Sequence, residues 1–225
     1  MGKLKKNIHL KIPLNFILTI KMADKKQIPQ FKIFDLYDLS EISIEDPGLK
    51  TAINLEPKLI LKSHGRNVQK LGQTRVNIVE RLMNKLSVPG HRGKKHKLIL
   101  GSSTGKYSRN MGIVLEAFKI ILEKTKKNPV QVLVKAIENG APRDEITVIE
   151  YGGARYPQAV DVSPLRRVNI TLKHIIHGAS DKAFGKKKTI AQALADEIIL
   201  ASEGNMESFA MKKKNESEKQ ADSAR

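Results

Sequence analysis

Apolar and polar residues alternate with a period of two along the segment "EITVIEYGGARYPQAVDV". That alternation is typical of half-buried β-strands, with Ile146 and Val148 on one face, and the Gly-Gly pair in the middle allows the positive φ of a tight reversal. Pro157 lacks the N–H of a ladder hydrogen bond, so we expect the returning strand at an edge. Because an isolated two-stranded ribbon is marginal in water, the pattern predicts a β-hairpin over about residues 146–162 that rests on another surface.

The periodicity then changes to that of a helix. Ser163 is expected to cap it and Pro164 to occupy its first turn, with Gly178 as its C-terminal stop. Its apolar stripe consists of Leu165, Val168, Leu172, Ile175 and Ile176. Its other face carries Arg166, Arg167, Lys173, His174 and His177. An ordinary solvated face is the simplest interpretation of such a basic stripe, unless the rest of the chain indicates a polyanionic partner.

Two further helices are predicted from apolar residues spaced three and four apart. One begins at Thr74 and the other after Ser108. The expected inner-face residues of the first are Val76, Val79, Leu82, Met83 and Leu86. Those of the second are Met111, Val114, Leu115, Phe118, Ile121 and Leu122. We interpret both stripes as hydrophobic core.

Two more helices are predicted from capping boxes. Asn128 with Gln131 precedes one that ends at Gly140, and Thr189 with Gln192 precedes another that ends near residue 204. The predicted fold class is therefore mainly α: a helical bundle of about five to six helices with a protruding β-hairpin.

Composition fits one domain with a hydrophobic core, since 40% of the 225 residues are hydrophobic. The chain has no cysteine, which excludes disulfides, thiolate metal sites and cysteine nucleophiles. A cytoplasmic location fits this composition. No apolar run reaches the roughly 20 residues that span a bilayer, so we expect no membrane partner.

Charge changes the interpretation of the basic helix. The chain has a formal net charge of +18, and residues 58–110 hold thirteen Lys and Arg against Glu80 alone. Residues 163–188 hold seven against one, whereas residues 31–57 carry six acids and two lysines. Clustered positive charge indicates phosphate binding, and the expected partner is a polyanion.

The N-terminal residues are expected to form separate segments. Residues 1–21 open with lysines and a short apolar run, and Met22 resembles an independent start, so this basic extension is one we expect to be absent from the mature chain. A weak signal or a membrane-surface helix is the alternative. Leaving it out removes five lysines and no acid, which keeps a net charge of +13. We divide the remainder into an N-terminal arm, 22–57, and a helical domain, 58–225, that binds the polyanion.

The loop "SVPGHRGKKHKLILGSSTGKYSRN" resembles a nucleotide-binding loop in its glycines and lysine. Its spacing is wrong, because three residues rather than four separate Gly101 from Gly105, and Tyr107 follows Lys106 where Ser or Thr is needed. No Ser-His-Asp group or carboxylate pair indicates catalysis. The loop histidines have no acidic or cysteine ligand nearby in sequence, so we expect no metal, no cofactor and no enzymatic activity.

The low aromatic content narrows the kind of polyanion. Aromatic residues make up 4% of the chain and tryptophan is absent, so few platforms exist for stacking unpaired bases. Recognition is expected to depend on duplex and junction shape and on phosphates, as with structured RNA. A DNA-bending architectural protein and an RNA-processing enzyme are the alternatives.

The motif "GGARYPQAVDVSPLRRVNITLKHI" resembles the signature of the universal small-subunit ribosomal protein S-seven family, in its archaeal and eukaryotic style, whose eukaryotic member is called S-five. Further blocks, "INLEPKLILKSHGRN", "VNIVERLMNKL", "GKYSRNMGIVLEAFKIILEKTKKNPVQVLVKAIENGAPRDE" and "KKTIAQALADEII", resemble the family in order. The resemblance covers residues 28–225, and the first 21 residues lie outside it.

The resemblance implies a helical protein whose partners are the 3′ major domain of small-subunit ribosomal RNA and neighbouring proteins of the head and platform. It implies a role in nucleating assembly of the head. It further implies that the ribbon and the C-terminal helix face the exit-site transfer RNA and the messenger path. The hairpin would then be a structural arm without chemistry of its own.

Carried onto this chain, the resemblance and the charge pattern together give a set of expected RNA contacts in two blocks. The first block consists of Lys62, His64, Arg66, Arg75, Arg92, Lys94, Lys95, Lys97, Lys106 and Arg109. The second consists of Arg155, Tyr156, Arg166, Arg167, Lys173, Lys186, Lys187 and Lys188.

Overall fold

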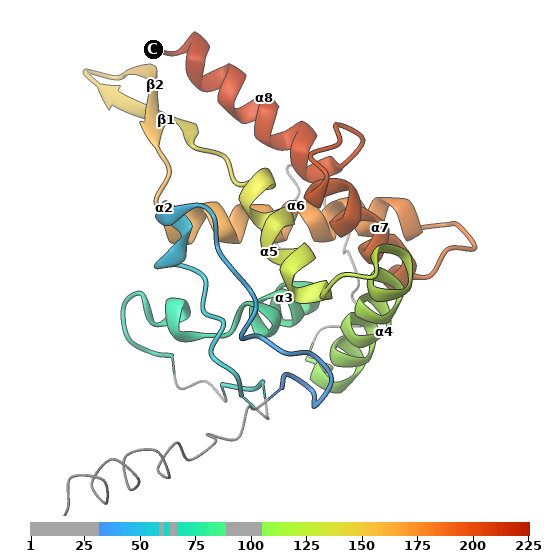
Figure 1. Cartoon of the computed structure of the whole chain (residues 1–225). Coiled ribbons are helices and arrows are strands. Elements are labelled where there is room, and N and C mark those ends of the chain that lie inside the picture. The colour runs from blue at the N-terminus through green and yellow to red at the C-terminus, as the bar shows by residue number, and fades with distance from the viewer. Residues whose placement is uncertain (1–31, 59–60, 64–66, 89–104) are drawn as a thin grey trace, which may run out of the picture.

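The computed structural model describes residues 32–58, 61–63, 67–88 and 105–225, which form helices around a core and one projecting hairpin (Figure 1). The elements are α2 (Pro47–Lys50), a 3₁₀ helix (Gly72–Arg75), α3 (Ile78–Ser87), α4 (Tyr107–Thr125), α5 (Pro129–Gly140), β1 (Asp144–Tyr151), β2 (Ala154–Asp161), α6 (Pro164–Ala183), α7 (Ile190–Ser202) and α8 (Phe209–Ser223). This architecture confirms the predicted fold class. None of the described helices is long and apolar enough to cross a bilayer.

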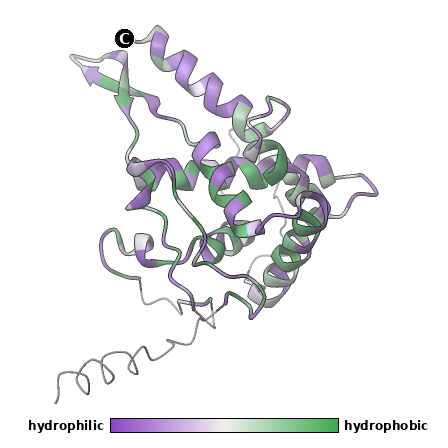
Figure 2. Ribbon diagram, viewed as in Figure 1, coloured by the Kyte–Doolittle hydropathy of each residue, from purple (hydrophilic) through white to green (hydrophobic). Residues whose placement is uncertain are grey.

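Helix α7 lies at the centre of the bundle, where α4, α5 and α6 pack against it. Its Leu194 and Ile198 are fully buried, as are Val168 and Leu172 of α6, which confirms these predicted stripes. The stripe of α4 is only partly inward, because Leu122 is 44% exposed. Figure 2 shows hydrophobic segments of these helices within the bundle, whereas α8 is mainly hydrophilic along its length.

The start of α3 differs from the predicted start at Thr74. Thr74 lies in the 3₁₀ helix, and the α-helix begins after Asn77, whose side chain accepts a hydrogen bond from the Val79 N–H at 2.9 Å. Val76 between them is extended, with φ −81° and ψ 132°. The prediction was wrong by one turn because the apolar spacing continues across this break in the backbone.

Of the two predicted capping boxes, one is present. Thr189 and Gln192 form the box that begins α7. Asn128 caps α5 as predicted, but the Gln131 amide is directed elsewhere: its Oε1 accepts from the Ser43 N–H at 3.1 Å and its Nε2 donates to the Ser43 carbonyl at 3.2 Å. The Gln131 side chain therefore ties the N-terminal segment to α5 instead of capping the helix.

Helix α6 begins where predicted but does not end at Gly178. Ser163 occupies the N-cap position without a side-chain capping hydrogen bond, and the helix continues for five residues beyond Gly178. A Cβ at Gly178 would lie 2.7 Å from the Phe209 Cβ and 2.8 Å from the Glu197 Cδ. Gly178 is thus needed for close helix packing and does not act as a helix stop.

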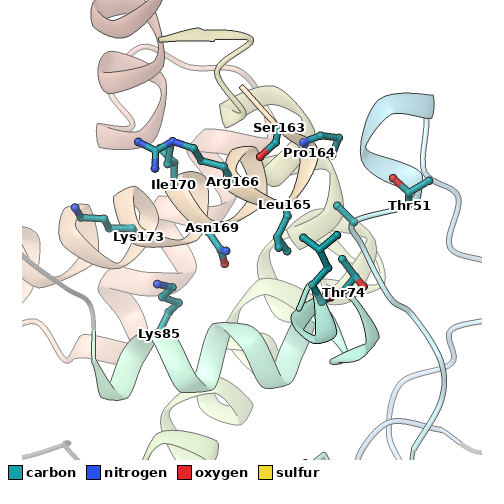
Figure 3. Close-up of a pocket in the computed structure, with 12 residues that line it drawn as sticks. Thr51, Thr74, Lys85, Ser163, Pro164, Leu165, Arg166, Asn169, Ile170 and Lys173 are labelled. Carbon is teal, nitrogen blue, oxygen red and sulfur yellow. Dashed lines mark hydrogen bonds between the residues drawn. The ribbon is translucent and has the colours of Figure 1, made fainter. Parts of the chain in front are cut away.

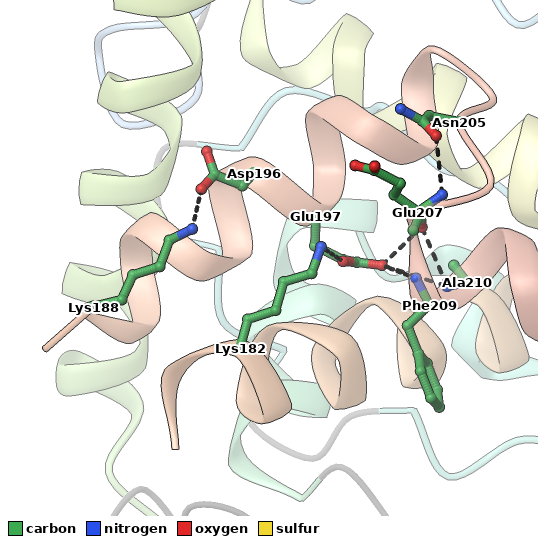
Figure 4. A network of polar contacts seen from close by, with 9 residues as sticks. Lys182, Lys188, Asp196, Glu197, Asn205, Glu207, Phe209 and Ala210 are labelled. Carbon is green, nitrogen blue, oxygen red and sulfur yellow. Dashed lines mark hydrogen bonds and ion pairs between the residues drawn. The ribbon is translucent and has the colours of Figure 1, made fainter. Parts of the chain in front are cut away.

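The side chain that approaches Gly178 also positions α8 (Figure 4). Glu197 is fully buried, and its carboxylate accepts hydrogen bonds from the Ser208 hydroxyl at 2.7 Å and the Phe209 N–H at 2.6 Å. Lys182 donates to its other oxygen at 2.6 Å. A negative charge at a helix N-terminus is favourable, so Glu197 joins α6, α7 and α8 at one point. Helix α8 was not predicted from periodicity; the family resemblance alone implied it.

The hairpin has the predicted form. Ile146 pairs with Ala159 and Val148 with Pro157 in an antiparallel register, and the two turn glycines have φ of +58° and +78°. Val148 is 58% exposed and Tyr151 81% exposed, so most of the ribbon projects from the bundle without cover from the described residues. This exposure agrees with a ribbon that rests on a partner.

The acidic segment near the N-terminus packs on the same core. Ile33, Tyr37 and Leu49 are buried, and the Tyr37 ring meets the Phe118 ring edge-on at 5.8 Å between centroids. This segment, for which the sequence indicated no partner, therefore lies against its own chain.

Candidate RNA-binding surface

The first turn of α6 carries two neighbouring arginines that are predicted RNA contacts and that point to different elements. Arg166 donates two hydrogen bonds to the Glu145 carboxylate of β1, at 2.7 and 2.8 Å. These bonds lower the pKa of Glu145 and raise the pKa of Arg166, because each group stabilises the charge of the other. The pair fixes the base of the hairpin to α6, although the Arg166 side chain remains 58% exposed.

Arg167 turns toward the N-terminal segment. Its Nη2 donates to the Asp46 Oδ2 at 3.0 Å, and its side chain is 12% exposed. Asp46 also caps α2 by accepting from the Gly48 N–H at 2.8 Å. Burial raises the pKa of Asp46, but these hydrogen bonds and the charge of Arg167 outweigh burial, and the pKa is lowered overall. Arg167 is thus held mainly within the chain.

Helices α3 and α6 bring the two basic sequence blocks together. Asn169 of α6 donates to the Gln73 Oε1 of the 3₁₀ helix at 2.9 Å. Next to this contact, Arg75 is exposed at the end of the 3₁₀ helix and Lys173 is half-buried on α6. Residues almost 100 positions apart are therefore in contact, although charge alone predicted only two separate blocks.

A second group of predicted contacts lies where α4 begins. The Lys62 ammonium lies 5.3 Å from the centroid of the Tyr107 ring, and the Tyr107 hydroxyl donates to the Leu61 carbonyl. Lys106 and Arg109 are exposed at the first turn of α4. The predicted contacts of this group are therefore accessible.

The remaining described contacts lie at the hairpin and in the turn after α6. On β2, Tyr156 is 58% exposed, and the Arg155 Nε lies 3.8 Å from the Glu150 Oε2 of β1. In the turn after α6, two exposed lysines precede Lys188, which pairs with Asp196 of α7.

Six predicted contacts lie outside the described residues. They are His64, Arg66, Arg92, Lys94, Lys95 and Lys97. The basic extension, the proposed start at Met22 and most of the loop compared with a nucleotide-binding motif lie there too.

The histidines of α6 were predicted to lie on its polar face, opposite the apolar stripe, and for His177 that prediction was wrong. His177 is 2% exposed. The His174 ring lies 5.9 Å from the Phe209 ring, and burial, followed by the charges of His177 and Lys173, lowers the pKa of His174 to about 4. His174 is consequently neutral at pH 7. Within the described part of the chain, no three His, Cys, Asp or Glu side chains are grouped to hold a metal ion.

The sequence interpretation missed two basic residues of α3 that face α6. Arg81 is 2% exposed and donates to the Ala52 carbonyl at 2.6 Å and to the Asn169 Oδ1 at 3.3 Å. Lys85 lies one turn further along the same face. Their spacing from Ile78, i+3 and i+7, was the available signal, because it places both charges beside an apolar stripe.

The sequence of this chain also matches a family of known proteins. A family described as ribosomal protein S7p/S5e matches residues 53–225. The chain belongs to this family. It is 47% identical over 197 residues to the small ribosomal subunit protein uS7 of Nanoarchaeum equitans, covering 87% of this chain and 100% of the relative. It is 48% identical over 194 residues to the uS7 of Archaeoglobus fulgidus, covering 86% and 94%.

Membership of the S7p/S5e family confirms the resemblance found in the sequence, including its archaeal style. A third relative, the uS7 of Methanosphaera stadtmanae, is 46% identical over 195 residues, covering 86% of this chain and 98% of the relative. These relatives are named as ribosomal proteins, a family not known as enzymes, in agreement with the expected lack of catalysis.

Proposed function

We propose that this chain is a structural protein of the small ribosomal subunit that binds the 3′ major domain of its ribosomal RNA and nucleates assembly of the head. The observation that carries the proposal is the group of basic residues gathered where α3 faces α6, with a second exposed group at the start of α4, in a member of the S7p/S5e family. Lysine and arginine side chains there neutralise phosphates and release counterions, which gives affinity without catalysis.

We also propose that the projecting hairpin contacts other components of the subunit. An exposed ribbon is stabilised when it lies against neighbouring RNA and protein. We place the hairpin and α8 beside the exit-site transfer RNA and the messenger path, where Tyr156 and Arg155 contact nucleic acid. The head and platform proteins are the neighbours that cover the apolar side of the ribbon.

We propose a division of the chain that follows the position of the basic residues, because the expected RNA contacts all lie after residue 58. Residues 58–225 form the RNA-binding domain, and residues 22–57 form an arm whose described part adds Ile33 and Leu49 to the core. Residues 1–21 are proposed as an extension outside the mature chain, and mass spectrometry of the native N-terminus tests this.

Binding to a transcript of the head domain tests the proposal. If about six to ten phosphates are neutralised, the association constant falls by orders of magnitude between 50 and 200 mM salt. In mild salt the native protein should also sediment with small ribosomal subunits. A salt-independent affinity, or a protein that sediments alone, would contradict the proposal.

A further inference from the structure

A groove of about 680 Å³ lies between the 3₁₀ helix, α3 and the first half of α6 (Figure 3). Its walls are largely apolar and include Ala52, Leu71, Leu165 and Ile170. Leu71 is 64% exposed although it lines the groove, so water reaches an apolar wall there. A volume of this size accommodates a small organic group such as one nucleotide.

Positive charge gathers at one end of this groove. Figure 3 shows Lys85 extending from α3 toward α6, with Lys173 on the facing helix. Behind them Arg81 lines an adjoining pocket of about 280 Å³ that also includes Lys85. The Arg81 Nε is buried and has no hydrogen-bond partner among the described residues.

Arg81 and Lys85 of α3 and Lys173 of α6 differ from the two arginines in the first turn of α6. Arg166 and Arg167 each pair with a carboxylate of the same chain, whereas no described carboxylate pairs with Arg81, Lys85 or Lys173. Burial lowers the pKa of Lys85, and the charges of Lys173 and Arg81 lower it further. Half-buried like charges without a counter-ion destabilise the free protein, so an anion from outside the described structure would relieve them.

We propose that this groove binds one nucleotide that projects from the structured RNA, with its phosphate between Lys85 and Lys173 and its base against the aliphatic side chains of Leu71 and Leu165 in place of an aromatic platform. The proposal rests on the proposed function for the identity of the partner. An RNA nucleotide supplies both features the groove requires: an anion for the cationic end and a flat apolar surface for the walls. Asn169 and Thr74 also line the groove: the Asn169 amide has one N–H beyond its bond to Gln73, and the Thr74 hydroxyl, which donates to the Leu71 carbonyl, can accept a hydrogen bond from a base edge.

Two substitutions test the two halves of the site. Lys85→Met keeps roughly the length of the side chain and removes its charge, so it should weaken binding to the head-domain transcript. It should also reduce the salt slope, which is the slope of the logarithm of the association constant against the logarithm of salt concentration, by about the contribution of one phosphate. The same change should leave the melting temperature unchanged or raised, because a half-buried like charge is gone. Thr51→Leu narrows the groove from its exposed rim without adding an aromatic ring on which a base could stack; it should weaken binding several-fold and leave the salt slope unchanged.

Lys119→Met, on the exposed face of α4, is the matched control because it removes the same charge away from the groove. It should change the affinity less than Lys85→Met does. If the wild-type protein binds the transcript and both groove variants bind like Lys119→Met, the groove holds no nucleotide. If the groove variants bind naked RNA normally but fail to assemble with other subunit proteins, the groove holds a protein segment and the proposal is overturned. Failure of the wild-type protein to bind would instead contradict the proposed function itself.

Discussion

At the scale of single residues, Glu197 is a charged side chain that is fully buried in the core. Its carboxylate accepts hydrogen bonds from the Ser208 hydroxyl, the Phe209 N–H and Lys182. Glu197→Gln would place an amide where an anion accepts these bonds and would leave Lys182 without its counter-charge. We expect the free energy of unfolding to fall by about 2–4 kcal/mol in urea denaturation.

The control for this change is Glu116→Gln, an isosteric loss of one charge on the exposed face of α4. It should alter the free energy of unfolding by less than about 0.5 kcal/mol. Equal effects of the two substitutions would show that the buried network does not hold α8 in place.

At the scale of elements, the base of the hairpin is held from both sides. Arg166 of α6 binds Glu145 of β1. On the other side Glu218 of α8 accepts from the Arg143 N–H at 3.0 Å, and Arg225, which follows α8, pairs with Asp144 at 2.6 Å. The Arg166 pair can be exchanged, because a phosphate could replace the carboxylate on this 58% exposed guanidinium.

If phosphate replaces the Glu145 carboxylate on Arg166, substitutions of Arg166 and of Glu145 should change RNA binding in opposite directions. Arg166→Ala should weaken RNA binding, whereas Glu145→Gln should strengthen it about two- to threefold by releasing the arginine from an interaction worth less than about 1 kcal/mol. Dissociation constants measured at one salt concentration decide this, with Glu116→Gln as the control for the change in net charge. A weakening by Glu145→Gln as large as that by Arg166→Ala would mean that the pair must stay intact for RNA to bind and that phosphate does not replace the carboxylate.

These elements also show what the sequence could and could not predict. The hairpin, the start of α6 and the box at Thr189 were predictable, because alternation and capping are local patterns. The carboxylates that pair with Arg166 and Arg167 were not, since they lie 21 and 121 residues away. Gly178 was misjudged for a related reason: the side chains that require a glycine there come from other helices.

At the scale of the whole molecule, part of each basic block meets the other because α3 packs against α6, which brings Lys85 and Lys173 to one groove. Charge segregation was visible in the sequence, but the groove between Lys85 and Lys173 exists only in the fold. Positive charge by itself would bind duplex DNA and RNA alike, as in an architectural DNA protein. We infer that a fixed arrangement of cations, groove and projecting hairpin is instead complementary to one folded RNA surface.

This arrangement predicts discrimination between polyanions. Duplex DNA with the same number of phosphates should displace the head-domain transcript only at an excess on the order of 100-fold or more near physiological salt, since non-specific binding lacks the groove and hairpin contacts. Competition with labelled transcript measures this. Lys85→Met should narrow the difference, because it removes a contact made to the RNA but not required for DNA, whereas Lys119→Met should weaken both competitors alike. Displacement by an equal amount of DNA would mean that net charge governs binding and that the fold adds no selectivity for RNA.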